Sequence, residues 1–389
     1  MTFNKFSDQA GVNTKLAHSG NNPDDYFGFV NPPVVHASTV LFPNAETLKT
    51  EKQRYTYGTH GTPTTDALCE AINMLEGSSK TVLVPSGLAA ITVPLLGTLS
   101  SGDHALIVDS VYGPTRRFAN KMLKNLGIDV EYYDPMIGSA IEKLMKPNTK
   151  IVFTESPGSN TFEMQDIPAI SKVAHSHGAI VLMDNTWATP LNFKPLDHGV
   201  DISITAGTKY AAGHSDILIG FISANERTKQ LIEDAHKILG MSVSGDDAYN
   251  TLRSMRTMGL RLTHQSKTAL ELAQWLETMP QVAMVLHPSL PSHHGHDIWQ
   301  RDFNGASSLF SIVLKGGSEK ESHAFLNALN IFALGYSWGG YESLAVEVNL
   351  DDRVIKHQYC GPILRLQIGI EEFSDLKSDL EQALIATGL

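Results

Sequence analysis

Lys209 and Asp184 are the two residues of this sequence whose surroundings point most directly to chemistry. Lys209 follows a short apolar segment with Ile202 and Ile204 and precedes a loop kept tight by Gly213, so the pattern predicts a strand that runs into a turn. Lysines are mostly exposed, and a solvated lysine is the ordinary interpretation. The alternative is a lysine that forms a Schiff base, which requires a lowered pKa, a carbonyl-bearing cofactor and an acidic partner for that cofactor.

Asp184 qualifies as that acidic partner because it closes a continuous apolar run, residues 179–183. Such a run predicts a buried parallel strand that delivers a carboxylate to its C-terminal edge, where open α/β sheets bind ligands. Pyridoxal phosphate needs an anion against its ring nitrogen, so that the protonated ring can act as an electron sink. The acid lies 25 positions before the lysine (209 − 184), which leaves room for one crossover and a strand. An acid that ends a strand is also a common helix cap, so the pair alone leaves both interpretations open.

A possible phosphate site comes after the apolar segment 81–84, where Ser86, Gly87 and Leu88 lead into a helix of small residues. The start of a helix presents free backbone N–H groups at the positive end of the helix dipole, which favours an anion. An ordinary capped helix explains the same residues, because Ser and Gly are preferred caps. Tyr112 comes after another predicted strand and before a helix, where its ring can lie over a planar cofactor or be one more half-buried tyrosine.

Arg365 interrupts an apolar strand in which Leu364, Leu366, Ile368 and Ile370 alternate to one face. This alternation turns Arg365 to the opposite face. A structural ion pair is one explanation for an arginine at such a position. The other is capture of an amino acid's carboxylate, because the planar guanidinium can donate two parallel hydrogen bonds.

Several motifs together resemble the cofactor signature of the Cys/Met-metabolism family of pyridoxal-phosphate enzymes. They are Met-Asp-Asn-Thr-Trp at 183–187, Asp-Ile-Ser-Ile at 201–204, Thr-Lys-Tyr at 208–210 and Gly-His-Ser-Asp at 213–216. The stretch Tyr-Ser-Trp-Gly-Gly-Tyr-Glu-Ser at 336–343 resembles the bacterial cystathionine β-lyase branch of that family. The resemblance covers nearly the whole chain.

The resemblance implies a fold-type I, transferase-like α/β architecture with a mostly parallel central sheet and a smaller C-terminal α+β domain. Alternation of predicted strands and helices after Asp66 independently favours a parallel sheet. We expect an inter-subunit N-terminal arm at residues 1–61, a cofactor-binding α/β domain at 62–255 and a C-terminal domain at 256–389.

The resemblance also assigns roles. It makes Lys209 the Schiff-base and proton-transferring residue, Asp184 the partner of the ring nitrogen, and Tyr112 the residue that stacks on the ring. It places four residues at the phosphate, namely Ser86, Gly87, Leu88 and Thr208. It makes Arg365 the clamp for the substrate carboxylate, with Tyr336, Ser337 and Trp338 beside the substrate.

The implied reaction is pyridoxal-phosphate-dependent α,β-elimination of L-cystathionine to L-homocysteine, pyruvate and ammonia. Alternatives within the family are a cystathionine γ-lyase, a γ-synthase or a cysteine desulfhydrase. In γ-acting relatives an acid commonly precedes the motif serine, whereas this chain has Tyr336 before Ser337. A cofactor-binding regulator or scaffold is the non-enzymatic alternative, because a fold does not fix a function.

The N-terminal arm departs from the family pattern. Many relatives carry Tyr-x-Arg there and reach the cofactor phosphate of the adjacent subunit, and this chain has Tyr57, Gly58 and Thr59, followed by His60. The resemblance still makes Tyr57 a cofactor-contacting and catalytic residue of the neighbouring site. It therefore implies a homo-oligomer that is at least a dimer, with a tetramer expected.

Composition narrows the possible partners, the cellular location and the possible metal sites. A formal net charge of −11 argues against nucleic acids and anionic membranes as partners, because both require basic patches. The N-terminal residues contain no signal-peptide core and no apolar run reaches membrane-spanning length, so we expect a cytoplasmic protein. Cys69, Cys360 and the histidines at 293, 294 and 296 lack the ligand spacing of a zinc site, so no metal is expected.

Overall fold

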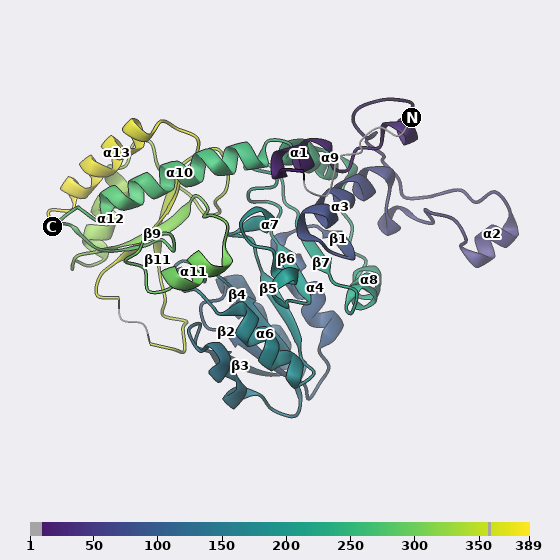
Figure 1. Cartoon of the computed structure of the whole chain (residues 1–389), viewed down its shortest axis with the longest axis horizontal. Helices are drawn as coiled ribbons and strands as arrows, with labels where there is room; N and C mark the ends of the chain where they lie inside the picture. Colours follow the sequence, from purple (N-terminus) through teal and green to yellow (C-terminus); the bar gives the residue numbers. More distant parts are fainter. Residues whose placement is uncertain (1–9, 357–358) are drawn as a thin grey trace.

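The computed structural model describes residues 10–356 and 359–389 and contains two β-sheets that lie side by side (Figure 1). Residues 1–9, where the sequence predicts no signal-peptide core, lie outside the described residues. The larger sheet occupies the centre of the molecule, and the smaller sheet lies toward the C-terminal end, under the long helix α10 (Met258–Leu276).

The larger sheet has seven strands in the order β1-β7-β6-β5-β4-β2-β3, and only β7 runs antiparallel to its neighbours. Its strands are β1 (Lys80–Val84), β2 (His104–Val108), β3 (Asp129–Tyr133), β4 (Thr149–Glu155), β5 (Ile180–Asp184), β6 (Ile202–Thr205) and β7 (Gly220–Ala224). The central strands are apolar and almost wholly buried, as expected for strands covered on both faces. The predicted mostly parallel sheet is therefore confirmed.

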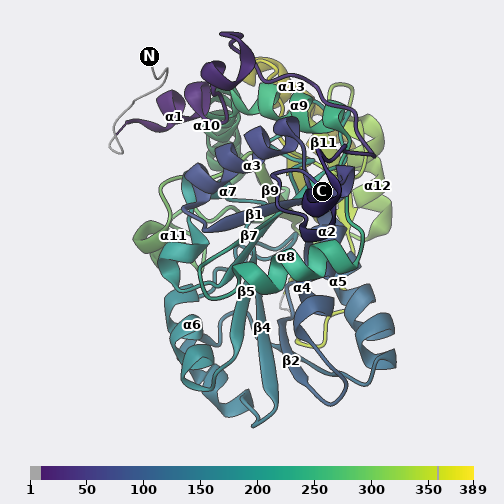
Figure 2. The ribbon, with the colours of Figure 1, turned by 90° about the vertical axis from the view of Figure 1, so that its right-hand side faces the viewer.

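Helices cover this sheet and connect its strands (Figure 2). Helix α4 packs on β6, β7 and α8, whereas α6 packs on β4 and β5. The helices of this part are α3 (Pro63–Glu76), α4 (Gly87–Thr98), α5 (Gly113–Phe118), α6 (Ile167–Ser176), α7 (Thr189–Asn192), α8 (Lys229–Ile238) and α9 (Gly245–Met255).

The smaller sheet has the order β10-β11-β12-β9-β8 and is antiparallel except between β10 and β11. Its strands are β8 (Val282–Leu286), β9 (Leu309–Leu314), β10 (Ala333–Leu334), β11 (Leu344–Val348) and β12 (Ile363–Gln367). Helices α10, α12 (Glu319–Ala328) and α13 (Phe373–Ala386) accompany it, together with α11 (His296–Asp302). A separate apolar core joins this sheet to α10, α12 and α13. The domain limits expected at 61/62 and 255/256 stay predictions.

Local signals in the sequence account for several boundaries. Asp166 caps α6 by accepting a hydrogen bond from the Ala169 N–H at 3.2 Å, and Gly77 ends α3 in the left-handed conformation at φ 71°. The predicted alternation in the last strand extends too far, because β12 ends at Gln367 and Ile370 lies beyond it, 49 % exposed. Regular period-two alternation thus continued past the point where strand pairing stops.

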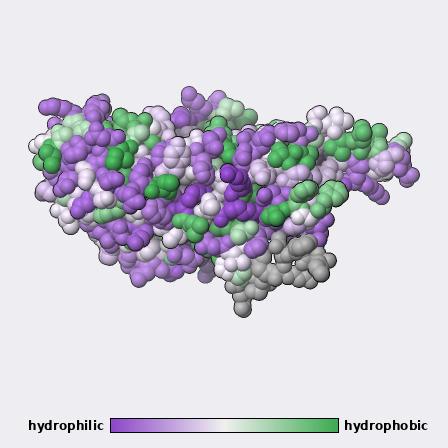
Figure 3. All heavy atoms as spheres, turned by 90° about the horizontal axis from the view of Figure 1, so that it is seen from above, coloured by the Kyte–Doolittle hydropathy of each residue, from purple (hydrophilic) through white to green (hydrophobic). Residues whose placement is uncertain are grey.

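The N-terminal arm is more ordered than its weak periodicity indicates, since it contains α1 (Val12–His18) and α2 (Ala45–Thr50). It projects from the side of the molecule in Figure 1 and exposes large apolar side chains, including Phe27 at 98 % and Leu41 at 85 %. Figure 3 shows hydrophobic residues exposed among hydrophilic ones at the same end of the molecule. Such exposure is typical of a surface that another chain covers.

Candidate active site

A cavity of about 360 Å³ lies where the carboxyl ends of the large sheet's strands face β12 of the small sheet. It contains most of the site residues predicted from the sequence, although they come from segments more than 270 positions apart. These are Ser86, Gly87, Leu88, Tyr112, Asp184, Thr208, Lys209, Tyr336, Ser337, Trp338 and Arg365. The geometry brings them together, and the individual roles stay predictions.

Lys209 lies half-buried in this cavity without a carboxylate in hydrogen-bond contact among the described residues. Its Nζ donates a hydrogen bond to Ser337 Oγ at 2.6 Å and lies 5.0 Å from the centre of the Trp338 ring. Burial, with a smaller contribution from the Arg365 charge, lowers the pKa of Lys209 to about 8. A substantial fraction of the amine is therefore neutral near pH 8, which an amine nucleophile or proton acceptor requires.

Asp184 ends β5 and points its carboxylate toward the same cavity. Thr186 holds Oδ1 through its N–H at 3.0 Å and its hydroxyl at 2.6 Å. Burial raises the pKa of Asp184, and these two hydrogen bonds and the charge of Lys209 act against the rise. No ion pair within residues 10–356 and 359–389 neutralises this carboxylate by direct contact, so a cation such as a protonated ring nitrogen suits the position.

Arg365 projects from β12 into the cavity, as its predicted side of the strand requires. Its Nη1 donates to Asn160 Oδ1 and its Nη2 to the Ser337 carbonyl, both at 3.2 Å. Burial lowers the pKa of Arg365 to about 10, which leaves the guanidinium charged at neutral pH. With neutral partners only, this guanidinium is suited to an incoming carboxylate.

The start of α4 lines the cavity with the residues that the sequence predicts to bind a phosphate. The Ser86 hydroxyl accepts from the Ala89 N–H at 3.1 Å, which leaves the earlier N–H groups of Gly87 and Leu88 available to a ligand. A Cβ on Gly87 would lie 2.5 Å from the Cβ of Ala206, so only glycine allows this close approach. The cap interpretation of Ser86 is therefore confirmed, and its role at a phosphate stays a prediction. The Thr208 hydroxyl is engaged with the backbone of Ile219, at 3.0 and 3.2 Å.

Two backbone conformations fix the loop above Lys209. Ser337 has a φ of 79°, a left-handed conformation that costs on the order of 1 kcal/mol for a residue other than glycine. Gly339, at a φ of 82°, lies against the Lys209 backbone, which a Cβ would approach to 3.1 Å. The Tyr336 side chain is 92 % exposed at the mouth of the cavity.

The cavity has further lining residues that sequence reasoning did not assign to the site, among them Glu155, Asn160 and Trp187. Glu155 ends β4 beside Asp184, and its Oε2 accepts a hydrogen bond from the Tyr112 N–H at 2.8 Å. A signal for Glu155 existed, because it closes an apolar strand as Asp184 does. Asn160 lies in the irregular loop between β4 and α6. Sequence periodicity does not predict where the side chains of such a loop lie.

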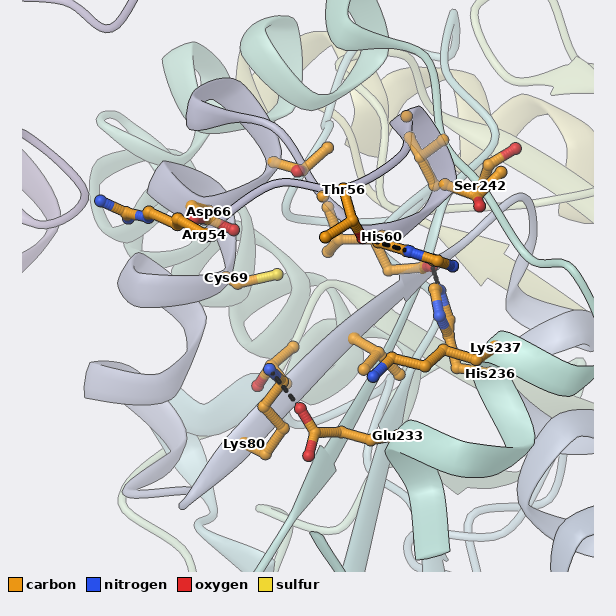
Figure 4. A pocket seen from close by; sticks show the side chains of 18 of the residues that line it. Arg54, Thr56, His60, Asp66, Cys69, Lys80, Glu233, His236, Lys237 and Ser242 are labelled. Carbon is orange, nitrogen blue, oxygen red and sulfur yellow. Dashed lines mark hydrogen bonds and ion pairs between the residues drawn. The ribbon is translucent and has the colours of Figure 1, made fainter. Parts of the chain in front are cut away.

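A second cavity, of about 470 Å³, lies between the arm, α3, β1 and α8 (Figure 4). Two of its cations are paired, because Lys80 is bound to Glu233 at 2.6 Å and Arg54 is bound to Asp66 at 3.0 Å. Thr59 and His60 line this second cavity, and the His60 ring contacts Thr56 at 2.8 Å. A second lysine, Lys237, also lines this cavity and makes no ion pair among the described residues (Figure 4).

Tyr57 lines neither of these two cavities. Its side chain is 48 % exposed, with the ring 6.2 Å from that of His60. The role predicted for Tyr57 belongs to the site of a neighbouring subunit, and it stays a prediction.

Among residues 10–356 and 359–389, no group of three or more His, Cys, Asp or Glu side chains is arranged to hold a metal ion. No helix within the same residues has the length and apolar character needed to cross a membrane.

Comparison with known proteins gives a consistent result. Residues 13–385 match the family described as Cys/Met metabolism PLP-dependent enzyme. A Rhizobium johnstonii protein named "Putative cystathionine beta-lyase" is 63 % identical over 97 % of this chain and 96 % of its own length. Cystathionine beta-lyase MetC of Escherichia coli is 42 % identical over 95 % of this chain and 97 % of its own length.

Among solved structures, the cystathionine gamma synthase of Xanthomonas oryzae pv. oryzae, in complex with aminoacrylate and cysteine, superimposes with a TM-score of 0.91. It is 30 % identical, and the alignment covers 97 % of this chain and 99 % of the other. The family match, the fold and a cavity suited to pyridoxal phosphate agree, so this chain belongs to the Cys/Met-metabolism family of pyridoxal-phosphate-dependent enzymes, as a carbon–sulfur lyase.

Proposed function

We propose that this chain is a cystathionine β-lyase, which converts L-cystathionine into L-homocysteine, pyruvate and ammonia. The observation that carries the proposal is the position of the Lys209 amine, held against Ser337 and Trp338 in the same cavity as Arg365. Support also comes from the names of the Rhizobium and Escherichia coli relatives.

Each residue has a defined task in this proposal. Pyridoxal phosphate, when bound, supplies an electron sink for the bond broken at Cα. Arg365 fixes the substrate carboxylate by two parallel hydrogen bonds, and Asp184 keeps the ring nitrogen protonated. The neutral Lys209 amine accepts the Cα proton and, as an ammonium group, returns a proton to the leaving sulfur. The N–H groups of Gly87 and Leu88 hold the phosphate.

The residues on either side of Ser337 favour β-elimination over γ-elimination. Tyr336, exposed at the mouth of the cavity, takes the place of the acid that commonly precedes the motif serine in γ-acting relatives. The bulky Trp338 ring, 5.0 Å from Lys209 Nζ, restricts the path of the substrate chain and favours cleavage next to Cβ. The experiment is to identify the keto acid released from L-cystathionine. Pyruvate with homocysteine supports the proposal, and 2-oxobutanoate with cysteine as the main products rejects it in favour of a γ-lyase.

A γ-synthase is the second candidate because the Xanthomonas oryzae enzyme has nearly the same fold. Incubation with cysteine and an activated homoserine ester tests it directly. Net formation of cystathionine at a rate above that of its cleavage would favour the synthase over the lyase.

We also infer a cytoplasmic homo-oligomer, at least a dimer and expected to be a tetramer, in which the arm completes the neighbour's site. The exposed apolar side chains of the arm support this inference. Thr59 offers one neutral hydrogen bond where many relatives have arginine, so Thr59→Arg is expected to slow loss of the cofactor on dialysis. His60→Ala is expected to hasten that loss.

Subunit mixing tests the arm more sharply. Inactive Tyr57→Phe and Lys209→Ala proteins, mixed under conditions of subunit exchange, are expected to regain activity because one hybrid site carries both native residues. No recovery despite proven exchange, with unchanged cofactor loss in the Thr59 and His60 variants, would show that the arm does not reach the neighbouring site.

A further inference from the structure

We propose that Glu155 is a positioning residue of this active site, which stays uncharged beside Asp184 and fixes Tyr112 at the edge of the cofactor cavity. The inference rests on the lyase activity proposed above and adds a residue that the comparisons leave unassigned. It starts from the placement of two acids at neighbouring strand ends.

Glu155 and Asp184 are directly paired in the parallel register of β4 and β5. Adjacent strands lie roughly 5 Å apart, and both residues close their strands, so both carboxyl groups meet the cavity at the same edge. Two anions at this separation repel each other in a poorly solvated site, and one of them takes up a proton. One of the two acids is therefore protonated while the other is ionised.

The surrounding groups favour Asp184 as the anion. Asp184 receives two hydrogen bonds from Thr186, whereas Glu155 receives one, from the Tyr112 N–H. Burial and the Asp184 charge raise the pKa of Glu155 well above its ordinary value. The other charged groups near Glu155 are Arg353 and Glu163, and these two are bound to each other at 2.7 Å.

The single hydrogen bond has a structural consequence for Tyr112. Tyr112 precedes α5, and its N–H is held by the Glu155 carboxyl, so Glu155 fixes the backbone from which the Tyr112 ring enters the cavity. A protonated carboxyl keeps a carbonyl oxygen for this bond and directs no charge at the cavity. Glutamine preserves both properties, because its amide is neutral and its oxygen accepts the same hydrogen bond.

Three variants distinguish the effect of the Glu155 hydrogen-bond acceptor from the effect of a charge on Glu155. Glu155→Gln is expected to keep kcat/KM within about threefold of the native enzyme, with an unchanged pH profile. Glu155→Ala removes the acceptor and is expected to lose about tenfold in kcat/KM, because one hydrogen bond positions the ring. Glu163→Gln is the matched control at a paired acid. It leaves Arg353 unpaired and is expected to lower the melting temperature more than Glu155→Gln does.

The deciding readout does not depend on turnover. The pH dependence of the visible absorption of the bound cofactor is measured for native protein and Glu155→Gln, together with the dissociation constant of the cofactor. The proposal expects coincident titration curves. A shift of about one pH unit or more would show that Glu155 is charged and overturn it. Native kcat/KM in a folded Glu155→Ala protein would also overturn it, and if that variant does not fold, the absorption titration decides alone.

The same experiments distinguish this inference from the proposed function. Native protein that makes no pyruvate from cystathionine disproves the β-lyase assignment, whatever the Glu155 variants do. The absorption titration needs only bound cofactor and no substrate, so its outcome bears on Glu155 alone.

Discussion

Lys80 in the larger of the two cavities described above and Lys209 in the smaller have opposite surroundings. Lys80 is bound to Glu233 at 2.6 Å, while Lys209 contacts a hydroxyl and an aromatic ring and has its pKa lowered to about 8. In the larger cavity Lys80 and Arg54 are paired with acids, and in the smaller an acid and a guanidinium are held mostly by neutral groups. A lysine of lowered pKa in one cavity with Asp184 and Arg365, more than cavity size, marks the site of chemistry.

The largest expected effect comes from removing each lysine in turn. Lys209→Ala is expected to lower the rate of pyruvate release by roughly a thousandfold or more, because covalent attachment and proton transfer are lost together. Lys80→Ala serves as the control and is expected to keep the rate within about twofold, because its amine makes only a partly exposed ion pair. Comparable losses in both variants would remove the distinction between the cavities.

A smaller effect is expected from the two arginines. Arg365→Lys keeps the charge but loses the bidentate fork, and a charge-assisted hydrogen bond is worth about 1.5–3 kcal/mol, so kcat/KM should fall by about ten- to a hundredfold. Arg54→Lys, in the second cavity, should leave steady-state kinetics within about twofold. If both variants behaved alike, Arg365 would not bind the substrate carboxylate.

The pH dependence of amine labelling measures the pKa of Lys209 and its electrostatic causes. In cofactor-free protein, labelling of the Lys209 peptide by an amine reagent should rise with pH through a midpoint near 8, since only the neutral amine reacts. Arg365 lowers this pKa and Asp184 raises it, so Arg365→Met should move the midpoint upward and Asp184→Asn should move it downward. Midpoints that do not respond to either change would contradict the electrostatic description of the site.

The smallest effect concerns stability. Breaking the Lys80–Glu233 pair by Lys80→Met should cost about 0–1 kcal/mol in the free energy of unfolding, because both side chains are partly exposed, at 40 % and 25 %. Urea unfolding at low and high salt measures it, and the difference from native protein should shrink as salt screens the pair. A loss that persists at high salt would show that Lys80 contributes by packing instead.

Local patterns in the sequence predicted much of the fold and part of the site. Strands β1 and β5 were readable from the apolar runs at 81–84 and 179–183, and Lys209, Asp184 and Arg365 from their places at strand ends or on a strand face. Asn160 and the pairing of Glu155 with Asp184 were not readable, because strand order decides which ends are neighbours. The placement of β4 beside β5 is a property of the sheet that no local pattern carries.

Borohydride reduction of the cofactor-loaded enzyme, followed by peptide mass mapping, shows directly which lysine carries pyridoxal phosphate. Reduction makes the lysine–cofactor linkage permanent, so the position of the label identifies the cavity that binds pyridoxal phosphate. We predict a single pyridoxyl label on the peptide that contains Lys209. A label on the Lys80 peptide, or an unmodified Lys209 in fully loaded protein, would contradict it.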